Sequence, residues 1–190
     1  MNENNEVKLG TIEYADDEHT SLPRLIGMRL PPLAIGFVLG ILLPFIISRF
    51  EELLTRDIRI AFFIPFIIYM ADAVATQTES IYIRDLKTGK ASFKKYLLKE
   101  SFVGLILGLV SGVIGGIVAF LWFKSMPLAY TVAFGMLGAI VVAPIVALTV
   151  VEILELEHTD PAVGSGPIAT VIQDSLSILI FGLIASVFFL

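Results

Sequence analysis

Two aspartates lie inside apolar stretches of the sequence, where a carboxylate is costly to place. Asp174 interrupts the stretch 162–190, which holds no other charged residue, and Asp72 lies within an earlier apolar stretch. About 20 apolar residues span a bilayer, and an Asp near mid-membrane costs about 2.5–3.5 kcal/mol on insertion scales. Contact with protein, water or a cation offsets this cost. Because no Lys or Arg lies inside these stretches, the two carboxylates indicate a cation pathway.

The composition is that of an integral membrane protein. Of the 190 residues, 56% are hydrophobic, against about 45–50% in soluble domains, and the mean hydropathy is +0.88. The net charge of −5 argues against a nucleic-acid partner, and the lack of cysteine excludes disulfides and thiolate metal sites. Residues 1–22 are acidic and polar, unlike a signal peptide. We expect them to form a disordered cytoplasmic tail, followed by one transport domain over residues 23–190.

Five apolar runs predict an all-α membrane protein with five transmembrane helices per chain. The runs cover residues 30–48, 60–78, 101–123, 127–151 and 167–189. Each has the length of a transmembrane helix. Nine Lys and Arg residues lie in the N-terminal segment and the connection 79–100, and four lie on the other side. The positive-inside rule therefore predicts a multi-pass protein of the cell membrane with its N-terminus inside and its C-terminus outside.

Small residues recur at every fourth position of the third and fourth runs. They are Gly104, Gly108 and Gly112 on the third run, and Ala139, Ala143 and Ala147 on the fourth. Such faces allow helices to approach closely. We expect the glycine face to pack against another helix, with the alanine face as its candidate counterpart.

The helical period places further polar residues beside each aspartate. The predicted stripes are Asp72, Thr76 and Glu79 on the second run, and Thr170, Asp174 and Ser177 on the fifth. From the centres of their runs, Asp72 lies about 4–5 Å and Asp174 about 6 Å toward the cytoplasm, at 1.5 Å per residue. The similar depths favour a shared cavity lined by these groups. The alternative is polar contact between helices without an ion.

The connection before the fifth run is acidic and ends at Asp160. Its acidic residues are Glu152, Glu155, Glu157 and Asp160. One interpretation is a solvated turn. The other is an electronegative vestibule that concentrates cations on the cytoplasmic side, with Asp160 as a candidate ion contact.

Oxygen ligands without sulfur or clustered histidine favour Mg²⁺, Mn²⁺ or Ca²⁺ over zinc or copper. Mg²⁺ keeps several waters and is usually held by one or two carboxylates. One Asp174 from each chain of a homodimer, placed on a twofold axis, supplies such a pair. This chemistry alone does not separate Mg²⁺ from Mn²⁺ or Ca²⁺.

Three stretches resemble the transmembrane domain of the MgtE family of magnesium channels and transporters, which is related to eukaryotic solute-carrier magnesium transporters. The first runs from Phe63-Ile64-Pro65 through Met70 to Thr76-Gln77-Thr78 and Arg84. The second is Lys99-Glu100 before the glycine-rich run. The third is Asp160-Pro161-Ala162-Val163-Gly164-Ser165-Gly166-Pro167, followed by Thr170 and Asp174.

The resemblance implies a five-span homodimer in which Asp174 holds hydrated Mg²⁺ at the dimer axis. The family's glycine-rich motif in the second span reads Ala71-Asp72-Ala73-Val74-Ala75-Thr76-Gln77 here, so a carboxylate replaces a glycine. The resemblance begins near Arg29, and we expect the family's N-terminal cytosolic sensor modules to be lacking.

We therefore expect a Mg²⁺ channel or transporter, with Mg²⁺ as transported ion and no cofactor. Exchange against Na⁺ or H⁺ stays open, because intramembrane carboxylates also relay protons or cations. The alternative from another class is a membrane scaffold or assembly subunit that transports nothing. The predicted spans contain no Ser/His pair and no histidine motif for a catalytic metal, so we do not expect an enzyme.

Overall fold

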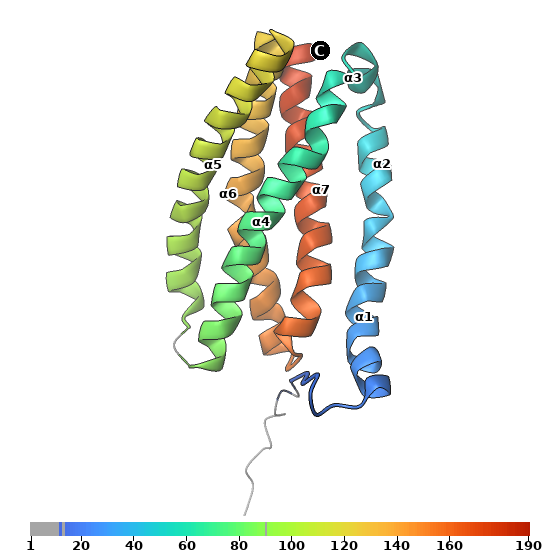
Figure 1. Cartoon of the computed structure of the whole chain (residues 1–190), viewed down its shortest axis with the longest axis vertical. Helices are drawn as coiled ribbons and strands as arrows, with labels where there is room; N and C mark the ends of the chain where they lie inside the picture. Colours follow the sequence, from blue (N-terminus) through green and yellow to red (C-terminus); the bar gives the residue numbers. More distant parts are fainter. Residues whose placement is uncertain (1–11, 13, 90) are drawn as a thin grey trace, which may run out of the picture.

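A computed structural model describes residues 12, 14–89 and 91–190, which form helices and no strand. The helices are α1 (Leu22–Gly40), α2 (Leu42–Ser48), α3 (Glu51–Arg56), α4 (Arg59–Lys87), α5 (Phe93–Phe123), α6 (Met126–Leu156) and α7 (Pro161–Phe189). Figure 1 shows the long helices running side by side, with the short α3 at the end that holds the C-terminus.

The five predicted spans are confirmed within the described residues. The segment Leu22–Ser48, which comprises α1 and α2, and the four long helices α4 to α7 are each long and apolar enough to cross a membrane. The helices extend further than the apolar runs. α4 continues to Lys87, and α7 begins at Pro161 rather than at residue 167. The apolar runs mark the hydrocarbon region, whereas the hydrogen-bonded helix continues into polar surroundings.

The start of α7 follows from local sequence. Asp160 is its N-cap, and its side chain accepts a hydrogen bond from the Ala162 N–H. Pro161 occupies the first helical position, where the missing N–H costs nothing and the fixed φ suits the helix. This start adds nearly two turns to the predicted helix and brings Ser165 inside it.

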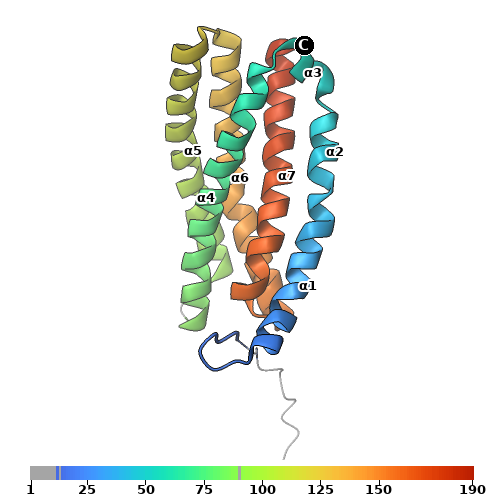
Figure 2. The same ribbon diagram turned by 45° about the vertical axis from the view of Figure 1, so that its right-hand side comes forward.

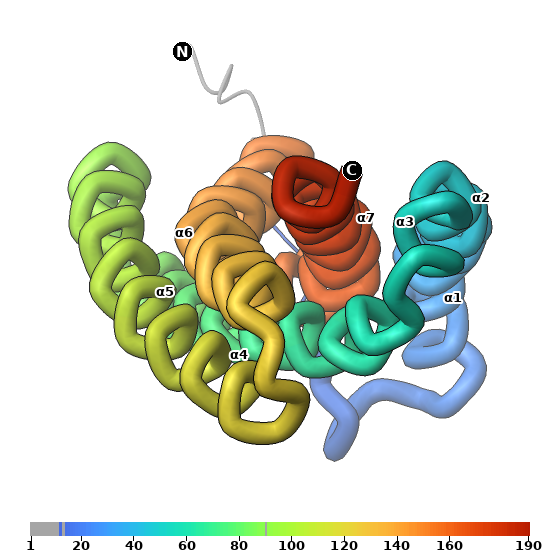
Figure 3. Tube along the Cα trace, turned by 90° about the horizontal axis from the view of Figure 1, so that it is seen from above, coloured from blue at the N-terminus to red at the C-terminus, as the bar shows by residue number. Residues whose placement is uncertain are grey.

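α6 and α7 lie at the centre of the bundle. Figure 3 shows α5 at one edge, α1 and α2 at the other, and α4 crossing beside both central helices. Figure 2 shows the same crossing from the side. The core joins Phe63 and Ile67 of α4 to Met136 and Ile140 of α6 and to Phe181 of α7. No residue of α1 or α2 is buried, and both helices pack on α7.

The glycine face of α5 packs tightly on α6, as predicted. A Cβ atom added at Gly112 would lie 2.5 Å from the carbonyl oxygen of Ala133, and one at Gly116 would lie 2.9 Å from the Ala133 Cβ. The expected counterpart was wrong. Ala139, Ala143 and Ala147 are buried in the core with side chains of α4 and α7. A four-residue spacing identifies a face of one helix but not the neighbour that covers it.

Two arginines hold the end of the bundle that contains α3. Arg56 donates to the main-chain oxygen of Phe189 at 3.0 Å, and Arg59 donates to that of Phe123 at 3.5 Å. Arg59 also donates to both carboxylate oxygens of Asp57, at 2.7 and 2.5 Å. These charged hydrogen bonds hold the pKa of Asp57 below its usual value.

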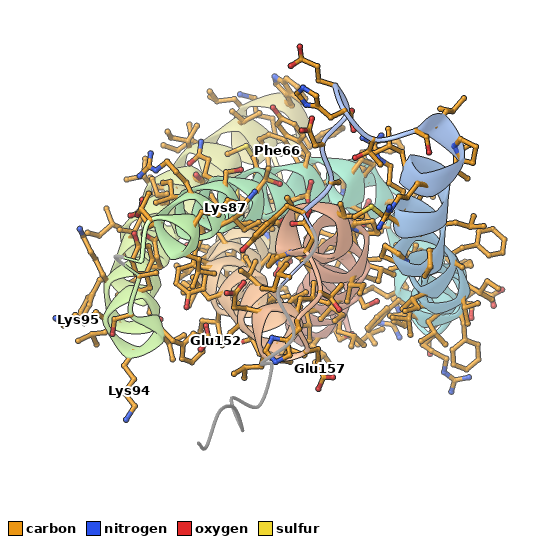
Figure 4. The ribbon with its side chains drawn as sticks, turned by 90° about the horizontal axis from the view of Figure 1, so that it is seen from below. Phe66, Lys87, Lys94, Lys95, Glu152 and Glu157 are labelled. Atoms are coloured by element: carbon orange, nitrogen blue, oxygen red, sulfur yellow. The ribbon has the colours of Figure 1, made fainter. Side chains whose placement is uncertain are left out.

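The opposite end carries part of the predicted tail. Residues 1–11 and 13 of that tail lie outside the described residues. The Ala15 N–H donates to Asp160 at 2.8 Å, and Asp17 forms an ion pair with Arg29 at 2.7 Å. Figure 4 looks onto this end, where Lys94 and Lys95 lie at the α5 edge and Glu152 and Glu157 lie nearer the middle.

Candidate functional site

The antiparallel helices α4 and α7 bring two predicted polar stripes together. The Thr170 hydroxyl donates to Asp72 Oδ1 at 3.2 Å. Nearer the end that holds Lys94, the Ser165 hydroxyl donates to Glu79 Oε1 at 2.6 Å. Because the two helices run in opposite directions, successive turns of α4 meet successive turns of α7 in reverse order. The result is one polar stripe between the two helices.

Asp174 continues this stripe by one turn of α7 beyond Thr170. Its side chain is half-buried, and its Oδ1 is buried without a hydrogen-bond partner among the described residues. Asp72 lies on the facing helix α4, where it accepts the hydroxyl of Thr170, one turn before Asp174. A buried carboxylate oxygen without a partner is costly, and a second negative charge nearby adds to that cost. A cation beside Asp174 offsets both contributions.

A groove between α1 and α7 leads to Asp174. It has a volume of about 490 Å³, and its walls include Leu33, Gly36 and Phe37 of α1 as well as Thr170 and Asp174 of α7. Gly36 brings the helices close, since a Cβ added there would lie 2.9 Å from the carbonyl oxygen of Pro167. Two polar side chains thus face a largely apolar groove.

The number of acids at this site limits the kind of coordination. Among the residues that the structure describes, no three His, Asp or Glu side chains form a group able to hold a metal ion. Ca²⁺ takes six to eight oxygen ligands, whereas Mg²⁺ keeps several of its waters and binds one or two carboxylates. Two carboxylates, Asp72 and Asp174, correspond to the number that a hydrated Mg²⁺ binds.

The remaining predicted residues have separate positions. Thr76 is exposed on α4, between Asp72 and Glu79. Ser177 is buried and accepts a hydrogen bond from Gln173 Nε2 at 3.0 Å. Ser177 lies about 60° from Asp174 around α7, so the two are neighbours on the helix and differ in burial. Ser177 packs in the interior, whereas Asp174 lines the groove.

Asp160 is a structural residue at the start of α7. Its Oδ1 accepts the Ala162 N–H at 3.0 Å and its Oδ2 accepts the Ala15 N–H at 2.8 Å. It lies 14 residues before Asp174, or about 21 Å along a helix at 1.5 Å per residue. Asp160 therefore does not contact an ion held at Asp174.

The acidic connection is also partly engaged in structure. Glu152 accepts a hydrogen bond of 2.5 Å from the buried Tyr82 hydroxyl of α4. On the same side of α4, Thr78 donates to Glu100 of α5 at 2.9 Å. These contacts tie α4 to α5 and α6, on the side away from Asp174.

Sequence reasoning missed two polar residues of α7. Ser165 lies before the predicted start of the helix, although Asp160-Pro161 is an N-cap signal that includes it. Gln173 precedes Asp174 directly and is fully buried. Its signal was an amide side chain within an apolar run, which is costly to bury and needs a partner.

Comparison with known proteins agrees with this arrangement. The family model MgtE, described as divalent cation transporter, matches residues 64–184. A magnesium transporter MgtE of Enterococcus faecalis is 35% identical over 163 residues, which are 84% of this chain and 36% of that protein. A magnesium transporter MgtE of Bacillus subtilis is 30% identical over a segment covering the same shares. The chain thus spans about a third of the length of these relatives.

The matched region includes Asp72, Glu79, Thr170 and Asp174 of the polar stripe, but not the α1 wall of the groove. It covers well over half of the chain, including α5, α6 and most of α4 and α7, and leaves out α1 and α2. This chain is thus a multi-pass protein of the cell membrane that belongs to the MgtE family of divalent cation transporters.

Proposed function

We propose that this chain carries Mg²⁺ across the membrane along the stripe between α4 and α7, with Asp174 as its principal ion contact. The observation that carries the proposal is the buried Asp174 Oδ1, which has no hydrogen-bond partner among the described residues and lies on the groove between α1 and α7. The names of the two relatives support Mg²⁺ as the ion. Mn²⁺ and Ca²⁺ are the competing substrates.

Asp72 and Glu79 extend the path toward the end of the bundle that holds Lys94. Thr170 and Ser165 donate hydrogen bonds to these carboxylates and keep them oriented. We place this end in the cytoplasm, because Lys and Arg residues concentrate there. Asp72 makes exchange against Na⁺ or H⁺ a specific alternative to passive conduction, since it adds a second carboxylate that a coupled cation can occupy.

A homodimer completes the proposed site. One chain contributes Asp174 and the neighbouring Asp72, and no three acids form one group among the described residues. A twofold partner would add a second Asp174. The glycine face of α5 does not argue for this dimer, because α6 covers it within the chain. Mass measurement in nanodiscs tests the assembly. A monomer with full flux would refute a site shared between two chains.

Divalent-cation flux into proteoliposomes tests the function, with and without a Na⁺ or pH gradient. We expect Asp174→Asn to abolish Mg²⁺ flux, whereas Glu51→Gln, which removes an exposed charge of α3 outside the polar stripe, retains it. A wild-type protein that moves no divalent cation would favour the scaffold alternative. Flux of Mn²⁺ or Ca²⁺ in preference to Mg²⁺ would change the substrate but keep the path.

Ligand-dependent stability gives an independent measure of binding. At tenfold excess over the dissociation constant, a cation that binds the folded state stabilises it by about 1.4 kcal/mol. For a chain of this size, this corresponds to an increase in Tm of roughly 3–6 °C. We expect Asp174→Asn to lose most of this increase while keeping its metal-free stability, because asparagine preserves shape and lowers the desolvation cost. Retention of both flux and stabilisation would exclude Asp174 as the ion contact.

A further inference from the structure

We propose that Gln173 is a positioning residue, whose buried amide sets the rotation of α7 and thereby directs Asp174 toward the groove between α1 and α7. The inference deepens the proposed function and rests on it, because it concerns the orientation of Asp174, the proposed ion contact. Gln173 itself does not line the groove. It acts through the backbone of α7, which carries the two side chains at adjacent positions.

The contacts of Gln173 join α7 to the central helix α6. The side chain is fully buried, and its Nε2 donates to the carbonyl oxygen of Ala139 at 3.1 Å and to the Ser177 hydroxyl at 3.0 Å. Ala139 is also fully buried, in the core with side chains of α4 and α7. The amide therefore connects the middle of α7 to one defined point on the backbone of α6.

The neighbouring contacts between the two helices are apolar. Toward the start of α7, Ala169 packs with Val146 and Val150 of α6. Toward its end, Phe181 packs against Gly135 of α6, where an added Cβ would meet the ring. Apolar contacts are non-directional, whereas a hydrogen bond weakens steeply when its angle changes. Gln173 supplies the directional contact between these two apolar regions.

Because of helix geometry, this contact determines the direction in which the Asp174 side chain points. Successive residues of an α-helix lie about 100° apart around its axis, since there are 3.6 residues per turn. With Gln173 held toward Ala139, Asp174 is turned away from α6 and lines the groove. A rotation of α7 that breaks the Gln173–Ala139 hydrogen bond moves the Asp174 carboxylate by the same angle.

The amide is not explained by stability alone. Gln173 Oε1 is buried without a hydrogen-bond partner among the described residues, and burial of such an atom disfavours the folded state. Methionine has a similar length and buries no polar atom. If Gln173 served only to pack α7 on α6, replacing it by methionine would cost neither stability nor transport. If Gln173 sets the rotation of α7, the same replacement would impair transport.

Cysteine labelling tests the rotation directly, because the chain has no cysteine of its own. Single cysteines are introduced as Asp174→Cys, on the groove, and as Ser177→Cys, at a buried position, and reacted with a charged thiol reagent. With Gln173 present, the cysteine at position 174 should react much faster than the one at position 177. In the Gln173→Met background this ratio of rates should fall several-fold.

Transport of the Gln173→Met variant with Asp174 intact provides the second readout. We expect its half-saturating Mg²⁺ concentration to rise several-fold while its Tm is equal to or above that of the wild type. An unchanged ratio of labelling rates would overturn the inference, and so would a lower Tm with unaltered Mg²⁺ dependence. If Gln173→Met does not fold, Gln173→Asn, whose shorter amide does not reach Ala139, replaces it.

The two readouts separate this inference from the proposed function. A wild-type chain without flux refutes the transport proposal, but the labelling ratio still reports whether Gln173 orients α7. Slow, equal labelling at both positions with Gln173 present would show that Asp174 does not face the groove, and it would overturn the inference.

Discussion

Replacing Gly36 by alanine tests whether α1 and α7 meet as closely as the groove requires. A Cβ at this position would lie 2.9 Å from the carbonyl oxygen of Pro167 and 3.3 Å from its Cβ. Backbone atoms cannot rotate away, so α1 must move off α7. Gly27 provides a matched control on the same helix, because a Cβ added there meets nothing within 4 Å.

Both substitutions gain the higher helix propensity of alanine, but only Gly36→Ala also creates a close contact with α7. In a helix interior, Gly→Ala contributes about 1 kcal/mol, whereas overpacking costs about 1–3 kcal/mol. Gly27→Ala should therefore raise the Tm by about 2–4 °C, at 2–4 °C per kcal/mol for a chain of this size. Gly36→Ala should leave the Tm unchanged or lower it, by up to about 8 °C on the same scale.

Thermal unfolding in one detergent, followed by intrinsic fluorescence, measures the difference between the two variants. Flux in proteoliposomes should fall for Gly36→Ala and stay at the wild-type level for Gly27→Ala, because Gly36 and Asp174 line the same groove. Equal increases in Tm for both variants would refute the reasoning, since they would mean that α1 does not touch α7 at Pro167.

Three further predictions follow from other contacts. Asp72→Asn should alter the ion selectivity or the gradient dependence of flux more than the thermal stability, because Asp72 is only partly buried and accepts one hydrogen bond, from Thr170. If the variant keeps the selectivity and gradient dependence of the wild type, the role of Asp72 is structural. The pKa of Asp57 is lowered in the folded state, so its stabilising effect is complete above the unfolded pKa of about 4 and is lost as the pH falls through the folded pKa. Asp57→Asn should flatten this acid part of a Tm–pH profile, and an unchanged profile would contradict the role of its hydrogen bonds with Arg59. Cysteines introduced by Lys94→Cys and Leu190→Cys should react from inside and outside the cell, respectively, and labelling of position 94 from outside would reverse the orientation.

The five spans could be predicted from sequence because they depend on local properties. Length and hydropathy decide whether a segment satisfies its backbone inside a bilayer, and neither needs information on neighbouring helices. The same holds for Asp72 and Asp174, whose cost inside a span is visible without a structure. Helix ends were predicted less well, since hydropathy marks the hydrocarbon region and not the last hydrogen bond of the helix.

Contacts between helices were decided by the tertiary structure. Periodicity indicated which residues share a face of one helix, but not that Thr170 meets Asp72 or that Ser165 meets Glu79, because those pairs depend on how α4 and α7 cross. For the same reason, the glycine face of α5 meets Ala133, Leu137 and Pro144 of α6 rather than the predicted alanines. The sequence also did not show that Ser177 would be buried beside Gln173, because that contact depends on how α7 packs on α6. The groove at Asp174 depends on how α1 packs on α7, and no local property of either helix specifies that packing.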